Sequence, residues 1–133
     1  MTQENVEAAR ALVKLWNEGT RSVPTEYFDP AVELESPFSS LVGEPYRGHA
    51  GIERWVHDVD EQFSEWRIHL EDVREVGSTV IIIARLHGRG RASGIQFDQP
   101  SAVVMDFVSA GRVTRMRIYA DVSEALKAVG LEE

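Results

Sequence analysis

Two residues of the chain, Arg85 and His87, have side chains suited to proton chemistry and stand two positions apart in a stretch patterned as a strand. Residues at that spacing share one face of a strand, so the guanidinium would lie beside the imidazole. A neighbouring cation favours the neutral, basic form of histidine, which can accept a proton near neutral pH. The alternate residues of the same stretch form a second, apolar candidate for the inward face: Val80, Ile82, Ala84 and Leu86. We favour this apolar face as the inner one, which directs Arg85 and His87 to solvent or to a partner chain. They are catalytic candidates only if the strand is turned the other way.

A second group of reactive side chains consists of Glu53, His57 and Glu61, which recur at every fourth position of a predicted helix. Carboxylate and imidazole groups on one helix face can bind a divalent metal. This face lies opposite an apolar stripe, an arrangement typical of a helix face exposed to water. We therefore expect no metal site. The chain has no cysteine, which excludes disulfides, thiolate metal sites and a cysteine nucleophile.

Glycine spacing gives no evidence of a nucleotide site. Gly88, Gly90 and Gly94 form the pattern G-x-G-x-x-x-G between two predicted strands. The dinucleotide-binding fingerprint instead requires G-x-G-x-x-G at the start of a helix. The sequence also lacks the Gly-Lys-Ser/Thr of a phosphate-binding loop. We expect the protein to work without a cofactor.

The composition is that of an ordinary globular domain, and we treat residues 1–133 as one domain. Hydrophobic residues make up 43% and charged residues 27% of the 133 positions. There are 14 Lys and Arg against 22 Asp and Glu, a formal charge of −8. A net anion repels phosphate backbones, so we expect no nucleic-acid partner. The arginines of the C-terminal half are explained by cross-strand pairing with acidic residues.

Hydropathy predicts no membrane partner. The longest strongly apolar run covers residues 80–84, far short of the roughly 20 residues that a spanning helix needs. The first ten residues, MTQENVEAAR, carry early acidic residues and lack the apolar segment of a secretory leader. We expect a soluble protein of the cytoplasm.

Hydrophobic periodicity predicts the order of the elements. A repeat of three to four residues predicts helices over 2–17, 24–28, 50–64 and 123–129. Alternation predicts strands over 32–36, 66–70, 79–87, 96–108 and 113–119, with a loop over 37–48 and a flexible connection over 88–94. Helices mostly precede the strands, so the class is α+β, with helices packed on one face of a curved antiparallel sheet.

The stretch from Val80 to Ala84 is apolar at every position. A strand of this kind is covered on both faces, and the helices can cover only one. The other face must meet a second subunit, a sheet that curls over it, or a terminal segment. This pattern suggests a homodimer, with an interior strand of a strongly curled sheet as the alternative.

The order of elements and four sequence blocks resemble the NTF2-like superfamily, and within it the SnoaL-like and ketosteroid isomerase-like branch. The blocks are ALVKLWNEGT at 11–20, the stretch from Tyr27 through VELESPF to Gly48, GIERWV at 51–56 and VVMDFVSAGRVTRMRIYAD at 103–121. The resemblance implies a cone-shaped α+β fold whose sheet holds the helices on its concave face. Members of this superfamily include isomerases, cyclases, dehydratases, epoxide hydrolases and non-catalytic binding proteins, so the fold alone does not choose an activity.

The resemblance also argues against two known chemistries. Block matching places Leu12, Ser36 and Val103 where a steroid isomerase of this fold has a tyrosine and two aspartates. None of these three can replace the missing groups, so we expect no steroid isomerase activity; efficient turnover of a ketosteroid would contradict this. The epoxide hydrolase pattern also fails, because His87 and Ile118 stand where aspartates would be expected.

The resemblance implies a cavity between the helices and the sheet. Its expected apolar walls are Trp16, Tyr27, Phe38, Trp55, Val103, Met105 and Ile118, and its expected polar contacts are Ser36 and Ser101, with Gln99 beside them. A mostly apolar cavity with few polar groups is typical of a small-ligand site. We expect a small hydrophobic ligand. The protein would be either a cofactor-independent isomerase, cyclase or dehydratase of unassigned activity, or a non-catalytic binding or dimerisation module.

Overall fold

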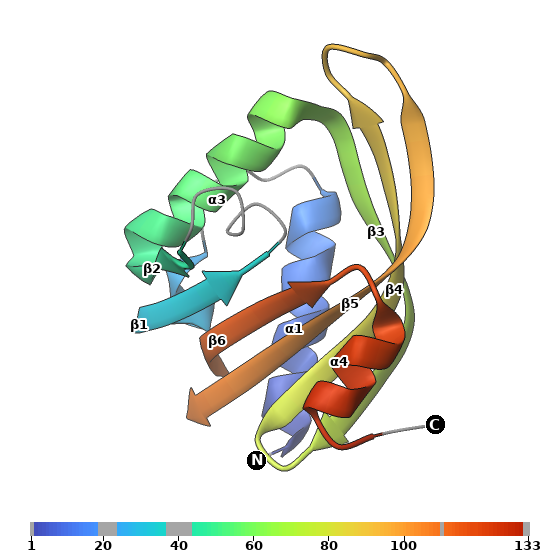
Figure 1. Cartoon of the computed structure of the whole chain (residues 1–133). Helices are drawn as coiled ribbons and strands as arrows, with labels where there is room; N and C mark the ends of the chain where they lie inside the picture. The colour runs from blue at the N-terminus through green and yellow to red at the C-terminus, as the bar shows by residue number, and fades with distance from the viewer. Residues whose placement is uncertain (1, 19–23, 37–43, 110, 132–133) are drawn as a thin grey trace.

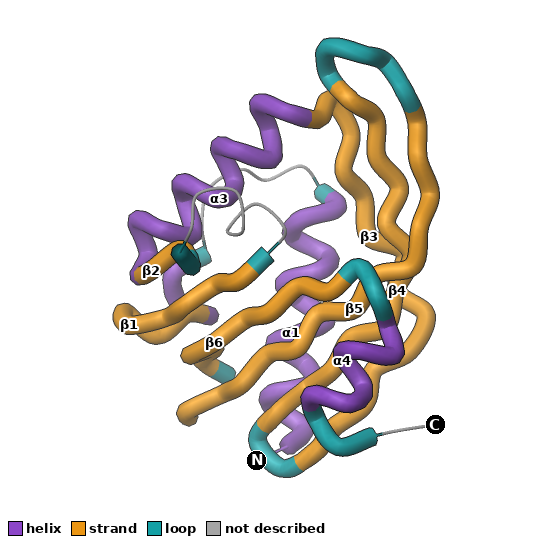
Figure 2. The backbone as a smooth tube through the Cα atoms, in the orientation of Figure 1, coloured by secondary structure: helices purple, strands orange, loops and turns teal. Residues whose placement is uncertain are grey.

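A strongly curved sheet bends around two helices, and a third helix lies on its opposite face (Figure 1). The computed structural model describes residues 2–18, 24–36, 44–109 and 111–131. Its elements in chain order are α1 (Thr2–Asn17), η1 (Thr25–Tyr27), β1 (Phe28–Glu35), β2 (Tyr46–Arg47), α3 (Gly48–Gln62), β3 (Phe63–Val76), β4 (Thr79–Gly90), β5 (Gln96–Ser109), β6 (Arg112–Tyr119) and α4 (Val122–Ala128). Figure 2 shows how far the long strands β3, β4 and β5 extend beyond the rest of the sheet.

The strand order is β2-β1-β6-β5-β4-β3, so β4 is an interior strand, as its apolar pattern predicts. The α+β class and the curved sheet are confirmed, with one difference in strand direction. β1 pairs with β6 in parallel, while every other pairing of the described sheet is antiparallel. The two strands are far apart in the chain, so no hairpin turn dictates their relative direction.

β1 begins earlier than the alternation predicts. The strand was expected from residue 32, yet it starts at Phe28 and runs through Asp29 and Pro30. A residue before proline prefers an extended backbone, which suits a strand as well as a helix end. The pairing of β1 with β6 shifts register between Phe28 and Glu33, and proline is tolerated at such an irregularity because it has no N–H to donate. The short strand β2 lies inside the predicted loop, where two residues are too few to show a period.

β4 also extends into the predicted flexible connection, because Gly88 is a strand residue that pairs with Phe97 of β5. A Cβ placed on Gly88 would lie 2.1 Å from Cζ of Phe97, so the phenyl ring covers the glycine. Glycine is required here for close packing and not for flexibility.

The apolar face favoured by the sequence pattern is the inner face of β4. It consists of the buried side chains Val80, Ile82, Ala84 and Leu86. Ile82 is fully buried and shares one core with Val13 of α1 and with Ile52 and Val59 of α3. Burying a side chain of this size contributes about 1.5–3 kcal/mol, so this layer is a main source of stability.

The outer face of the sheet is covered in part by α4, the terminal segment that was one of the alternatives for the second face of β4. Ile81 is fully buried in a second cluster with Val104, Ala125 and Leu126. Asp121 caps the N-terminus of α4, and its carboxylate accepts a hydrogen bond of 2.9 Å from Ser123 N. Hydrogen bonds from Ser123 hold the pKa of Asp121 below its usual range. Ile81 therefore has no exposed surface to offer a second subunit.

The end of α1 is joined to the outermost strand, β3, by side-chain hydrogen bonds. Asn17 donates from Nδ2 to the carbonyl of Ile68 at 2.7 Å and accepts from Ile68 N at 2.9 Å. Trp16 donates from Nε1 to the carbonyl of Trp66 at 2.7 Å. These contacts satisfy backbone groups along the free edge of β3, which would otherwise need water or another chain.

Among the helices in the described ranges, none is long and apolar enough to cross a membrane.

Replacing Asn17 by alanine should lower the free energy of unfolding by about 1–3 kcal/mol, because two hydrogen bonds to Ile68 are lost. Urea unfolding followed by circular dichroism measures the change. Glu18→Ala is the matched control, since Glu18 is the exposed next residue. Equal stabilities of the two variants would show that the contact with β3 contributes nothing.

Candidate functional site

A cavity of about 100 Å³ lies between α1, α3 and the inner face of the sheet. Its walls are formed by Leu12, Val13, Leu15, Trp16, Pro24, Phe28, Leu34, Ile52, Trp55, Val56, Ile68, Ile82, Val103, Met105, Met116 and Ile118. The helices contribute one wall through their apolar stripes, and alternate residues of the strands contribute the other. Such a space favours apolar molecules, because none of the described residues on these walls is charged.

A second cavity of about 280 Å³ adjoins the first toward the extended part of the sheet. It is lined by Ser36, Trp55, Phe63, Trp66, Phe97, Gln99 and Ile118. Trp55 and Ile118 belong to both sets of walls and mark the junction. The polar side chains Ser36 and Gln99 lie only in this second part. The two spaces together form an apolar interior with polar groups on one side, and we treat them as the candidate site.

The structure places most of the sequence-predicted site residues on these walls. Trp16, Trp55, Val103, Met105 and Ile118 line the first cavity. Ser36 lines the second cavity, as Gln99 does.

Two predicted residues, Tyr27 and Ser101, are not brought to either cavity. Tyr27 packs against the main core without reaching the walls. Ser101 is buried on the same strand face as Val103, but its hydroxyl donates to the carbonyl of Tyr119 at 3.4 Å. Phe38 lies outside the described residues.

Arg85 and His87 lie on the outer face of β4, away from the cavity. Arg85 Nε lies 2.7 Å from Asp98 Oδ1, and His87 Nδ1 lies 3.3 Å from Asp98 Oδ2. The hydrogen bond from Arg85 holds the pKa of Asp98 below its usual range. Both side chains thus contact the carboxylate of Asp98 at the surface, the orientation that the apolar alternation of β4 predicts by placing Leu86 inside.

The three positions matched to steroid isomerase residues also reach the site. Leu12 and Val103 lie on the walls of the first cavity, and Ser36 lies on the wall of the second. None of the three carries the carboxyl or phenol that such an isomerase uses at these positions.

Several wall residues were not predicted as site residues. They are Leu12, Val13, Leu15, Pro24, Phe28, Leu34, Ile52, Val56, Ile68, Ile82 and Met116 in the first cavity, and Phe63, Trp66 and Phe97 in the second. Helical spacing marked Ile52 and Val56 as core, but it does not distinguish a cavity wall from filled core. Phe97 pairs with Gly88 across β4 and β5, and this pairing, which the sequence alone does not give, is what marks it as a wall residue.

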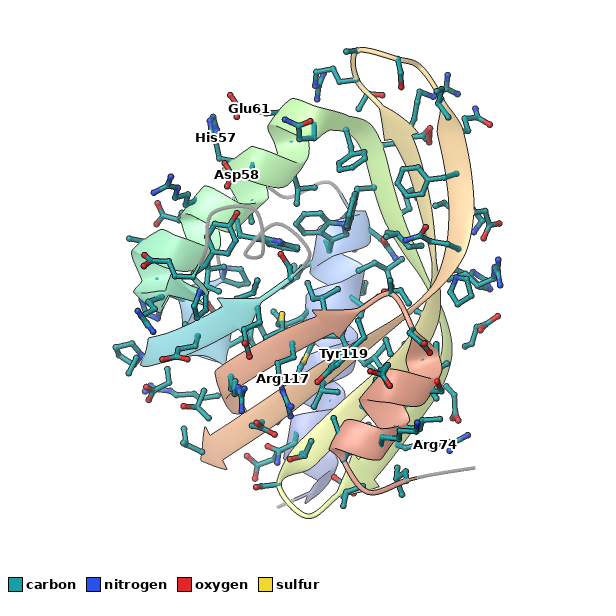
Figure 3. All side chains as sticks on the ribbon, viewed as in Figure 1. His57, Asp58, Glu61, Arg74, Arg117 and Tyr119 are labelled. Atoms are coloured by element: carbon teal, nitrogen blue, oxygen red, sulfur yellow. The ribbon has the colours of Figure 1, made fainter. Side chains whose placement is uncertain are left out.

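The polar face of α3 is directed away from the cavity, as Figure 3 shows for His57, Asp58 and Glu61. His57 Nε2 lies 3.4 Å from Glu61 Oε2, and both side chains are mostly exposed. Asp58 accepts a hydrogen bond of 2.6 Å from the hydroxyl of Tyr46. Burial, assisted by the neighbouring carboxylate, raises the pKa of Tyr46 to about 12. In the described part of the chain, no group of three or more metal-ligating residues is positioned to bind an ion.

Comparison with known proteins identifies the fold of this site. Residues 9–116 match the family model of the SnoaL-like domain. An NTF2-like protein of unknown function from Burkholderia pseudomallei is similar, with TM-score 0.79 and 16% identity over 95% of this chain and 97% of that chain. A candidate SnoaL-like polyketide cyclase from Jannaschia has TM-score 0.77 and 22% identity over 99% of this chain and 95% of that chain.

A third similar structure is a protein of ketosteroid isomerase-like fold from Catenulispora acidiphila in complex with trimethylamine. It has TM-score 0.75 and 18% identity over 94% of this chain and 93% of that chain. Identities of this size show a shared fold alone. No match to a curated protein was found.

The Tyr46–Asp58 contact gives a pH-dependent stability with a defined sign. Between pH 10 and 12 the unfolded chain releases the phenolic proton of Tyr46 while the folded chain keeps it, so stability falls as pH rises. Wild type should therefore be more stable than Tyr46→Phe below pH 10, and the difference should shrink toward pH 12. Urea unfolding of both proteins between pH 8 and pH 12 tests this. A constant difference over that range would contradict the raised pKa.

Proposed function

The chain belongs to the SnoaL-like domain family, and we propose that it uses the interior cavity of this fold to bind a small, neutral, hydrophobic molecule. The observation that carries the proposal is the apolar character of the cavity walls. In the first cavity every wall residue of the described chain is apolar or aromatic. In the second cavity the polar side chains are the uncharged Ser36 and Gln99. Burial of apolar surface would supply the affinity, and these few polar groups would orient the ligand.

The walls favour binding over proton-transfer catalysis. Isomerisation, cyclisation or dehydration without a cofactor needs a general acid or base within hydrogen-bond reach of the substrate. No carboxylate or histidine lies on the described walls of either cavity. Residues 19–23 and 37–43, which read GTRSV and PFSSLVG, contain no Asp, Glu or His either. The proposed function is therefore a non-catalytic binding protein.

We further propose that residues 1–133 form one domain that acts in the cytoplasm as a homodimer. The contact would use the part of the outer sheet face that α4 leaves uncovered. That area carries charges of both signs, including the pairs Arg85–Asp98 and Arg89–Glu65. A surface of mixed charge can be complementary to its own copy across a two-fold axis. On β6, Arg117 is held by a hydrogen bond of 3.2 Å to the hydroxyl of Tyr119 (Figure 3).

Filling the first cavity should abolish ligand binding. Val103 is buried on its wall, so Val103→Trp should weaken binding of indane, a neutral hydrocarbon, by at least tenfold in isothermal titration calorimetry. Overpacking of this kind costs about 1–3 kcal/mol, so circular dichroism and urea unfolding check that the variant folds. Val103→Phe is a milder version if it does not.

Arg85→Ala is the matched control, because Arg85 lies on the outer face of the neighbouring strand. Its affinity for indane should equal that of wild type. Undiminished binding by both cavity variants would show that the ligand site lies elsewhere.

The assembly proposal predicts a dimer in solution. Sedimentation equilibrium at micromolar protein concentration should give twice the chain mass of 14.9 kDa. A monomer across that range would overturn the proposed homodimer and would leave the cavity proposal untouched. Cell fractionation tests the cytoplasmic location, and recovery outside the cytoplasmic fraction would contradict it.

A further inference from the structure

We infer that the indole N–H of Trp55 is the hydrogen-bond donor of the cavity and that the bound molecule carries a matching acceptor atom. This rests on the proposed function and makes it more specific. Trp55 lies on the inner face of α3, is 8% exposed, and belongs to the walls of both cavities. Its Nε1 is shielded from solvent and has no hydrogen-bond partner among the described residues.

The neighbouring Trp16 lines the same walls, and its indole N–H has a hydrogen-bond partner. The two rings lie 5.3 Å apart between centroids and are tilted by 38°. The N–H of Trp16 donates to the carbonyl of Trp66 at 2.7 Å and is therefore used by the fold. Of the pair, Trp55 is the one whose donor remains for another molecule.

An unpaired buried N–H is costly, because the group loses its hydrogen bonds to water and gains nothing in return. Buried polar groups in folded proteins nearly always have a partner, and a tryptophan N–H usually finds one. A phenyl ring at this position would provide apolar packing without that cost. A ligand that accepts a hydrogen bond from Nε1 would explain why this position holds a tryptophan, because binding would remove the free-energy cost of the unpaired N–H.

The surroundings of Trp55 define the chemistry of the acceptor. The indoles of Trp16 and Trp55 carry the side-chain hydrogen-bond donors on the described walls of the first cavity, and the rest of these walls is hydrocarbon or thioether. Among the described wall residues there is no cation to compensate an anionic ligand and no carboxylate to compensate a cationic one. The matching ligand is a neutral, mainly apolar molecule with one uncharged acceptor, such as a carbonyl or ether oxygen, near the junction of the two cavities.

Two pairs of probes differ only in such an acceptor: 1-indanone with indane, and 9-fluorenone with fluorene. Calorimetry with wild type should give about tenfold tighter binding of each ketone than of its hydrocarbon, the gain expected for one neutral hydrogen bond to a buried donor. Trp55→Phe keeps an aromatic ring and removes the N–H, so it should bind ketone and hydrocarbon equally. Arg85→Ala, on the outer face of β4, is the matched control and should keep the ketone preference of wild type.

Nitrogen-15 spectra give an independent readout of the donor. The chain has three tryptophans, and the indole signal missing from Trp55→Phe identifies Trp55. In wild type, each ketone should move this signal downfield more than its hydrocarbon does, as expected for a new hydrogen bond.

The outcomes separate this inference from the function on which it rests. Binding of the hydrocarbons without a ketone preference, or a preference that persists in Trp55→Phe, would overturn the role of Trp55 and leave the apolar site intact. No binding of either pair would overturn the proposed function itself, and the inference with it. If Trp55→Phe fails to fold, the indole signal of wild type still decides, since a ketone that leaves it unmoved contradicts the hydrogen bond.

Discussion

The attachment of α1 to the free edge of β3 is the contact on which the interior space depends. Asn17 and Trp16 bind backbone groups of Ile68 and Trp66. Edge-strand N–H and C=O groups need partners, and side chains from the last turn of α1 provide them. The same two residues hold the helix at a fixed position over the sheet. Residues of the preceding turns, such as Leu12, then become a cavity wall instead of closing onto the strands.

Curvature of the sheet has local causes that also shape the site. The β3–β4 pairing shifts register between Phe63 and Glu65 and again between Leu70 and Asp72, and such irregularities bend and twist strands. At the far end of the sheet, Gly88 allows the ring of Phe97 to lie flat over β4. Phe97 then reaches the aromatic rings of Phe63 and Trp66, with centroid distances of 5.5 and 6.2 Å. The features that bend the extended part of the sheet therefore also bring together the aromatic rings that line the second cavity.

The sequence predicts what depends on local periodicity. The helix and strand pattern, the α+β class and the inner face of β4 follow from residues such as Val80 and Ile82, because alternation places side chains on faces. The parallel pairing of β1 with β6 could not be predicted, since it joins strands about 80 residues apart. The site residues could likewise be predicted only where local periodicity places them. Helix and strand stripes identify Trp55 and Val103 as inward-facing, whereas Phe97 enters the walls only through its cross-strand neighbour.

Affinity and orientation would come from different parts of this site. Apolar burial has no direction, so walls such as Val103 and Met105 would hold many hydrophobic molecules without fixing their pose. A directional donor among uncharged wall residues would select one orientation, because the wrong pose would leave the N–H of Trp55 unpaired. The two residues that first suggested chemistry, Arg85 and His87, both contact Asp98 on the opposite face of the sheet. Under the proposed role of Trp55, the selectivity of the protein would depend mainly on this indole nitrogen, with Ser36 and Gln99 as further polar contacts in the second cavity.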